Sequence, residues 1–255
     1  MKARKRFGQH FLTDQGILNR IASTCQISES DTVFEIGPGH GALTEHLIAA
    51  HAHRYVAVEI DRDLTPLLAA RFPALELINK DILRVDLDEL AETFGNDLRV
   101  VGNLPYNIST PLIFHLLDHL AVISDMVFMV QKEVANRLVA GPGDKLYGRL
   151  SVMAGASLDC QYLFDVAPQA FDPPPAVDSA VIRMQPALRP AKVSDRALFS
   201  ALVRTAFSQR RKTLRNSLKG LASKETFDAC GLDSALRAEA LSVDDFAKLT
   251  NFISD

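Results

Sequence analysis

The order of apolar and amphipathic segments constrains the fold of this chain more than any other feature. Over roughly the first 185 residues, short apolar runs alternate with segments of helical periodicity, a pattern typical of β-α-β units and a mostly parallel sheet. We therefore expect an α/β fold. The expected strands are 32–36, 55–59, 75–78, 98–102, 126–130, 162–166 and 180–185. The expected helices include 17–24, 42–50, 64–71, 111–117 and 132–139.

The chain changes character in the segment Pro186–Pro190. Beyond it only helical patterns remain, at 228–231, at 242–252 and after Ser194 and Asp195, either of which can cap a helix. We expect a first domain of residues 1–187 and a small all-helical domain of residues 188–255.

The composition is that of an ordinary globular protein, with 47% hydrophobic and 23% charged residues. The three cysteines lie far apart and match no metal spacing, which favours a reducing cytosol over a disulfide framework. The start of the chain lacks the uninterrupted apolar run of a signal peptide, and no stretch approaches the ~18 apolar residues of a membrane span. We expect a cytoplasmic protein that does not enter membranes and acts as a monomer.

Basic residues are concentrated in two runs, although the net charge is −3. Each run contains no acidic residue, so each can attract phosphates while the whole chain stays soluble. For either run alone, a solvated helix face or terminus is the favoured interpretation, but the two runs together favour contact with a nucleic acid. The first run holds Lys2, Arg4, Lys5 and Arg6; the second holds Arg204, Arg210, Arg211, Lys212, Arg215 and Lys219.

A glycine-rich loop follows the first expected strand. The loop contains Gly37 and Gly39, and glycines there let the backbone turn sharply and approach a ligand closely. With Ala42 they also satisfy the dinucleotide fingerprint, and Glu59 ends the next strand, where a ribose-binding acid is expected. NAD and S-adenosylmethionine both carry such a ribose, so the loop and Glu59 leave both ligands open.

Two further acids favour the methyl donor over the dinucleotide. Glu35 comes directly before the loop, where a negative charge suits a cationic sulfonium but repels a pyrophosphate. Asp81 follows the third expected strand and can accept a hydrogen bond from the adenine amine of the cofactor.

The segment Asn103-Leu104-Pro105-Tyr106 follows the fourth expected strand and predicts an adenine-binding turn. The lone pair of the adenine amine is delocalised into the ring, so the amine is a poor nucleophile. The Asn103 side-chain oxygen and the Leu104 carbonyl can hold both amine hydrogens and free that lone pair. Pro105 stiffens the turn and Tyr106 offers a ring for stacking an extruded base. An ordinary Asn-x-Pro turn is the alternative, but it leaves the order of loop, acids and turn unexplained.

Six segments give the chain a resemblance to the small-subunit ribosomal RNA adenine dimethyltransferase family. They are Gly8–Leu12, Glu35–Gly39, Glu59–Asp61, Asn103–Thr110, Phe171–Ser179 and Ala206–Arg215. They occur in the family's order over almost the whole chain, and the start at Gly8-Gln9 favours the ribosomal branch over the erythromycin-resistance branch.

The resemblance implies a Rossmann-like methyltransferase sheet, a helical RNA-binding domain and S-adenosylmethionine as cofactor. It implies dimethylation of two adjacent adenosines in the hairpin loop near the 3′ end of 16S rRNA, within an immature 30S subunit. Phe171, Pro173 and Pro175 would help hold the target base, and the basic residues from Arg204 to Arg215 would grip RNA. Implied cofactor contacts are His10, Leu12, Gly37, Gly39, Glu59, Asp81, Ile82 and Asn103, where Ile82 stands in place of a smaller residue common in relatives.

His115 and His119 have a spacing that zinc can use on one helix face. No third ligand is evident nearby in the sequence, so we expect no metal site. Two other functions remain as alternatives: a nicotinamide oxidoreductase, and a non-catalytic factor of ribosome assembly.

Overall fold

The computed structural model describes residues 10–254, which fold as two compact units. Within the described residues, the first unit comprises 10–135 and 161–186, and the second comprises 136–160 and 187–254. One edge of this division lies between residues 186 and 187, one residue before the expected boundary. The segment 136–160 differs, because Tyr147 packs in the core of the second unit together with Phe199 and Phe246. Burial of that ring, 1% exposed, draws its segment away from the first unit.

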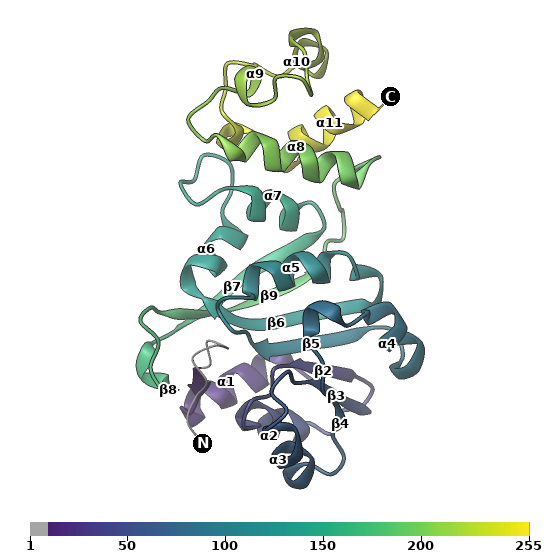
Figure 1. Cartoon of the computed structure of the whole chain (residues 1–255), viewed down its shortest axis with the longest axis vertical. Helices are drawn as coiled ribbons and strands as arrows, with labels where there is room; N and C mark the ends of the chain where they lie inside the picture. Colours follow the sequence, from purple (N-terminus) through teal and green to yellow (C-terminus); the bar gives the residue numbers. More distant parts are fainter. Residues whose placement is uncertain (1–9, 255) are drawn as a thin grey trace. The chain divides into compact units, whose positions relative to one another are not determined.

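The first unit is built on a mostly parallel sheet with the order β4-β3-β2-β5-β6-β9-β7 (Figure 1). Strands β2 to β6 pair in parallel, and β9 runs antiparallel to β6. The expected α/β class and all seven expected strands are confirmed, with ends that shift by a few residues. The strands are β2 (Thr32–Ile36), β3 (Arg54–Val58), β4 (Glu76–Ile78), β5 (Leu98–Asn103), β6 (Ile123–Gln131), β7 (Leu158–Val166) and β9 (Ser179–Pro186).

Helices connect these strands, as the sequence pattern predicts. Asp14 begins the first by accepting a hydrogen bond from the amide of Ile17. Asp86 caps a helix at Leu87–Phe94 that was not predicted, although its capping acid is visible in the sequence. The helices are α1 (Gln15–Cys25), α2 (Ala42–Ile48), α3 (Thr65–Arg71), α4 (Leu87–Phe94), α5 (Ser109–Leu117) and α6 (Lys132–Val139), with 3-10 turns η2 (Ile82–Arg84), η3 (Leu120–Val122) and η4 (Pro168–Ala170).

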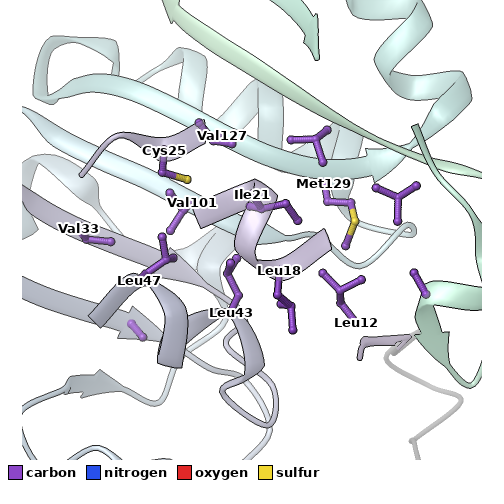
Figure 2. Packing of buried hydrophobic residues seen from close by; sticks show 14 of the residues in the cluster. Leu12, Leu18, Ile21, Cys25, Val33, Leu43, Leu47, Val101, Val127 and Met129 are labelled. Carbon is purple, nitrogen blue, oxygen red and sulfur yellow. The ribbon is translucent and has the colours of Figure 1, made fainter. Parts of the chain in front are cut away.

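One cluster of buried apolar side chains joins helices α1 and α2 to the sheet. Figure 2 shows Leu18 and Ile21 of α1 among side chains that come from β2, β5 and β6, such as Val101 and Met129. These strands read as continuous apolar runs because the parallel sheet is buried on both faces. The cluster keeps α1 in place beside the edge of the sheet that carries the glycine loop.

A partly buried charge network fixes the carboxyl end of α1. The Arg99 guanidinium on β5 donates to Asp31 over 2.9 Å and to Asp125 over 2.7 Å. It also donates to the backbone carbonyls of Cys25 and Gln26, which end the helix. Helix carbonyls that lack an intrahelical partner are satisfied here by a cation, which also suits the helix dipole.

A two-stranded sheet was not predicted. Strand β1 (Phe11–Leu12) pairs antiparallel with β8 (Phe171–Asp172), with Leu12 opposite Phe171. Strands of two residues carry no periodicity that a sequence pattern can show. This pairing brings the start of the described chain beside the proline-rich segment.

After residue 187 the described chain contains helices only, as predicted. Asp195, and not Ser194, caps the first by accepting from the amide of Leu198 over 2.9 Å. The second unit's helices are α7 (Arg149–Gly155), α8 (Arg196–Ser208), α9 (Leu214–Ser217), α10 (Lys224–Cys230), α11 (Val243–Ser254) and the 3-10 turn η5 (Ala238–Ala240). Among residues 10–254, none of the helices has the length and apolar composition that spanning a bilayer requires.

Candidate active site

The carboxyl ends of the parallel strands line one cavity of about 410 Å³. Strand β2 has β3 on one side and β5 on the other, so the chain reverses direction of winding there, which is where open α/β sheets bind ligands. The cavity brings together every predicted cofactor-binding and catalytic residue: His10, Leu12, Glu35, Gly37, Gly39, Glu59, Asp81, Ile82, Asn103, Leu104, Pro105 and Tyr106.

The glycine loop between β2 and α2 has the left-handed backbone that its glycines permit. Gly37 and Gly39 have φ of 68° and 60°. A Cβ at Gly39 would lie 3.1 Å from the Phe11 ring, so a side chain there would crowd β1. The amide of Gly39 donates to a Glu59 carboxylate oxygen over 3.1 Å. The loop is therefore tied to the acid at the end of β3.

Glu59 is buried, with 4% of its surface exposed. Its second oxygen accepts from the amide of Asp61 over 2.8 Å. Burial raises the pKa of the Glu59 carboxyl, while the backbone amides of Asp61 and Gly39 oppose that rise by favouring the charged form. The two amides leave further lone pairs on the carboxylate for acceptance from a ligand.

Glu35 lies beneath the glycine loop as a fully buried side chain. One carboxyl oxygen accepts from the hydroxyls of Thr44 over 2.7 Å and of Tyr55 over 2.8 Å. Burial raises the pKa of Glu35 to about 7, so its negative charge depends on pH near neutrality.

Asp81 begins the 3-10 turn η2 and accepts from the amide of Leu83 over 3.1 Å. About a third of its side chain is exposed, at 35%, so the carboxylate remains open to a ligand. Ile82 beside it is buried, with 5% of its surface exposed, and forms part of the apolar wall of the cavity.

The turn after β5 is anchored at several points. The Asn103 side-chain nitrogen donates to the carbonyl of His10 over 3.1 Å, which leaves the side-chain oxygen as the free acceptor. The amide of Leu104 donates to the carbonyl of Met129. The Pro105 carbonyl accepts from the hydroxyl of Ser109, which joins the turn to α5. A turn held this way can present its oxygens to a substrate without reorganising.

The Tyr106 side chain is half-buried and contacts one aromatic ring and one hydroxyl. It stacks on the His10 ring with centroids 5.6 Å apart and planes inclined by 27°. Its hydroxyl lies 2.6 Å from the hydroxyl of Ser179, a residue that was not predicted as part of the site. Burial raises the pKa of the Tyr106 hydroxyl, so it keeps its proton at neutral pH.

The proline-rich segment lies beside the cavity and does not line it. Phe171, predicted to hold the target base, is 4% exposed and packs in the core, because its pairing with Leu12 turns the ring inward. This burial argues against direct contact of that ring with a base. Pro175 is also buried, and Pro173 is exposed with its carbonyl 2.8 Å from Nδ1 of His10.

The basic residues of the second unit divide into two kinds. Arg204, Arg211, Lys212 and Arg215 are exposed. Arg210 is exposed as well, but its guanidinium donates to the carbonyls of Lys145 over 2.8 Å and Tyr147 over 2.9 Å, which secures the loop before α7. Arg210, which was predicted to grip RNA, thus has a structural attachment. The basic residues Lys2 to Arg6 and the Gly8-Gln9 pair lie outside the described residues.

The histidine pair on α5 and just beyond it has separate partners. His115 contacts the carbonyl of Val85 over 2.9 Å, and His119 contacts Asp88 over 2.8 Å. The sequence suggested no further ligand nearby, but folding brings Asp86 and Asp88 within 4.8 Å of His119. Both aspartates are exposed, and Asp86 caps α4 with its side chain.

Comparison with known proteins identifies the family. The family model described as ribosomal RNA adenine dimethylase matches residues 1–255, the whole chain. The chain belongs to the ribosomal RNA adenine dimethylase family. It is therefore an rRNA adenine dimethyltransferase, and the predicted Rossmann-like methyltransferase fold is confirmed.

Individual relatives agree with this family membership. The chain is 49% identical to a ribosomal RNA small subunit methyltransferase A of Marinomonas sp. (strain MWYL1), over 99% of this chain and 96% of the relative. It is 50% identical to the protein of the same name from Pseudomonas aeruginosa, over 100% and 96% of the two chains. A dimethyladenosine transferase from Plasmodium falciparum has a similar crystal structure, with a TM-score of 0.78, 27% identity and coverage of 94% and 96%.

Proposed function

We propose that this dimethyltransferase uses S-adenosylmethionine to methylate the N6 amines of two adjacent adenosines in the 3′-terminal hairpin loop of 16S rRNA in the immature 30S subunit. The observation that carries the proposal is the position of the Asn103–Tyr106 turn, which opens onto the same cavity as the glycine loop, Glu59 and Asp81. The small-subunit names of relatives that are 49% and 50% identical support the ribosomal substrate.

The cavity suits the cofactor in size and chemistry. Its volume of about 410 Å³ is within the range of sites for ligands of this size. Glu59 would accept hydrogen bonds from the ribose hydroxyls, and Asp81 would accept one from the adenine amine. The glycine loop leaves room for a close approach of the amino acid end, and Glu35 beneath it contributes negative charge when ionised. His10, Leu12, Gly37, Gly39 and Ile82 complete the proposed contacts.

The cofactor supplies an electrophilic methyl group on a positively charged sulfur. The Asn103 side-chain oxygen and the Leu104 carbonyl accept the two hydrogens of the target amine, which keeps the nitrogen pyramidal and its lone pair available. Tyr106 stacks on the extruded base. No residue has to remove a proton first, because the methylated amine is acidic and releases its proton to water.

The second unit contributes the RNA contact. Arg204, Arg211, Lys212 and Arg215 are exposed in one stretch of the chain without an acidic residue. Such side chains bind phosphates and release counterions, so affinity for RNA falls steeply as salt rises. In this proposal residues 1–187 form the catalytic domain and residues 188–255 the RNA-binding domain, and the protein acts as a cytoplasmic monomer.

Asn103 variants test the proposed chemistry. Asn103→Ala loses the amine acceptor and Asn103→Asp keeps two oxygens but loses the donor to the His10 carbonyl. We expect no methyl transfer by Asn103→Ala and strongly reduced transfer by Asn103→Asp. Binding of S-adenosylhomocysteine should be largely spared in both, because Asn103 is only one of several proposed cofactor contacts. Digestion of the RNA followed by mass spectrometry measures transfer on 30S particles that lack the modification. Wild-type activity in Asn103→Ala would refute the mechanism, and stabilisation of the wild type by NAD instead of S-adenosylhomocysteine would refute the cofactor.

Charge reversal tests the RNA contact. Arg211→Glu should weaken binding of 16S rRNA and lower the slope of log affinity against log salt by about one. Lys192→Glu is the matched control, because it makes the same charge change at another exposed position of the second unit. Equal RNA affinity of the two variants would show that Arg211 is only a solvated surface residue.

A further inference from the structure

Ser179 is a buried hydroxyl residue beside the catalytic turn. It begins β9, lies opposite Gln131 of β6 in the antiparallel pair and is 0% exposed. Its hydroxyl lies 2.6 Å from the hydroxyl of Tyr106. The sheet fixes the backbone of Ser179, so its side chain is a rigid reference point next to a ring that belongs to a loop.

The bond to Ser179 limits how the Tyr106 ring can move. The Cα of Tyr106 holds one end of the side chain, and the hydrogen bond holds the other. With both ends held, the ring cannot swing about its first torsion without breaking a partly buried hydrogen bond. The His10 ring, stacked 5.6 Å away, further restricts it.

The segment from Pro173 to Ser179 also holds the Asn103 side-chain amide, through the backbone and ring of His10. The Pro173 carbonyl lies 2.8 Å from Nδ1 of His10, and the His10 carbonyl accepts from the Asn103 side chain over 3.1 Å. The segment from Pro173 to Ser179 therefore sets both parts of the predicted base site, the stacking ring and the acceptor amide, without lining the cavity itself.

We propose that Ser179 is a positioning residue, whose hydrogen bond to the Tyr106 hydroxyl sets the angle at which the ring receives the target adenine. The inference rests on the proposed function, because it requires a base that stacks on Tyr106. It assigns the proline-rich segment an indirect part in catalysis: the segment orients the residues that touch the base.

Three variants isolate this hydrogen bond: Ser179→Ala, Tyr106→Phe and the double variant. Each single change removes the same bond from one side, and Tyr106→Phe keeps the stacking ring. We expect each to lower kcat of methylation of unmodified 30S particles about three- to tenfold, the worth of one buried hydrogen bond. The double variant should be no slower than the slower single variant, since the two changes act on one interaction. The affinity for S-adenosylhomocysteine should stay within about twofold of wild type in all three, because no cofactor contact changes.

A second readout separates positioning from general stability. An RNA hairpin with 2-aminopurine at the target position is bound by each variant, and its fluorescence reports how the extruded base stacks. We expect brighter complexes for Ser179→Ala and Tyr106→Phe than for wild type, because the ring no longer holds one angle. Thr250→Val is the matched control: it removes a buried hydroxyl that bonds the Phe246 carbonyl in α11, and it should change neither kcat nor fluorescence.

The outcomes that overturn the inference differ from those that overturn the proposed function. If the wild type methylates RNA and both single variants match it in kcat and fluorescence, Ser179 has no positioning role. Losses that multiply in the double variant also reject the shared hydrogen bond. If Ser179→Ala fails to fold, Tyr106→Phe alone decides, since its change is at a half-buried ring. A wild type that methylates no adenine refutes the proposed function itself.

Discussion

Gly102→Ala provides a sharp test of how tightly the catalytic turn is held against the glycine loop. Gly102 precedes Asn103 at the end of β5, opposite Phe128 of β6. A Cβ built there lies 2.6 Å from the backbone carbonyl oxygen of Ile36, the last residue of β2. Real Cβ atoms essentially never come closer than 3.0 Å, and a backbone oxygen in a central strand cannot rotate away.

The two strands must therefore separate by roughly half an ångström at this point, and overpacking of this kind costs about 1–3 kcal/mol. In a protein of this size the cost corresponds to a fall in Tm of roughly 2–10 °C. The separation moves Asn103 away from Gly37, which follows Ile36. Because a misplacement of about 1 Å can cost a hundredfold in rate, we expect roughly tenfold slower methylation.

Thermal unfolding and methyl transfer to unmodified 30S particles measure the two effects. Gly141→Ala is the matched control, since its Cβ meets no atom within 4 Å and its φ is not in the left-handed region. It should retain wild-type Tm and activity. If Gly102→Ala behaves like Gly141→Ala in both assays, β2 and β5 are not in close contact at Gly102 and the catalytic turn is not held by that contact.

Three further changes test other parts of the structure. Burial raises the pKa of Glu35 from 4.5 to about 7, so between these pH values the folded protein retains a proton that the unfolded chain releases. The free energy of unfolding should therefore fall as pH rises through this interval. Urea unfolding at several pH values should show a shallower fall for Glu35→Gln than for wild type, and identical pH profiles of the two proteins would contradict the shift. Arg99→Ala leaves Asp31 without its cation and Asp125 with only the Arg183 guanidinium, 3.6 Å away, and should cost about 3 kcal/mol in denaturant unfolding. Arg71→Ala at an exposed pair should cost under ~1 kcal/mol, and equal losses in the two variants would show that the Arg99 network does not stabilise the fold. Asp195→Ala removes the cap of α8 and should cost about 1 kcal/mol, and an unchanged unfolding midpoint would show that the cap does not stabilise the helix.

The sequence by itself determined the α/β class, the strands and the set of residues around the cavity. It could do so because apolar periodicity is local and because the carboxyl ends of parallel strands meet at one edge of the sheet. Glu35, Glu59, Asp81 and Asn103 each stand at or just beyond a strand end, so their meeting in one cavity follows from topology alone. The resemblance of six segments to a known family added the dimethylation and the 16S rRNA substrate.

Only the tertiary structure decided the contacts that depend on the register of distant segments. Leu12 pairs with Phe171, which lies more than a hundred residues further along the chain. Tyr106 contacts Ser179, which lies 73 residues further along. Nothing in the local sequence signals that Phe171 turns into the core, that Arg210 secures the loop at Tyr147, or that residues 136–160 join the second unit. The free energy of such contacts comes from packing and hydrogen bonds that exist only once the elements have assembled, so no periodicity records them in advance.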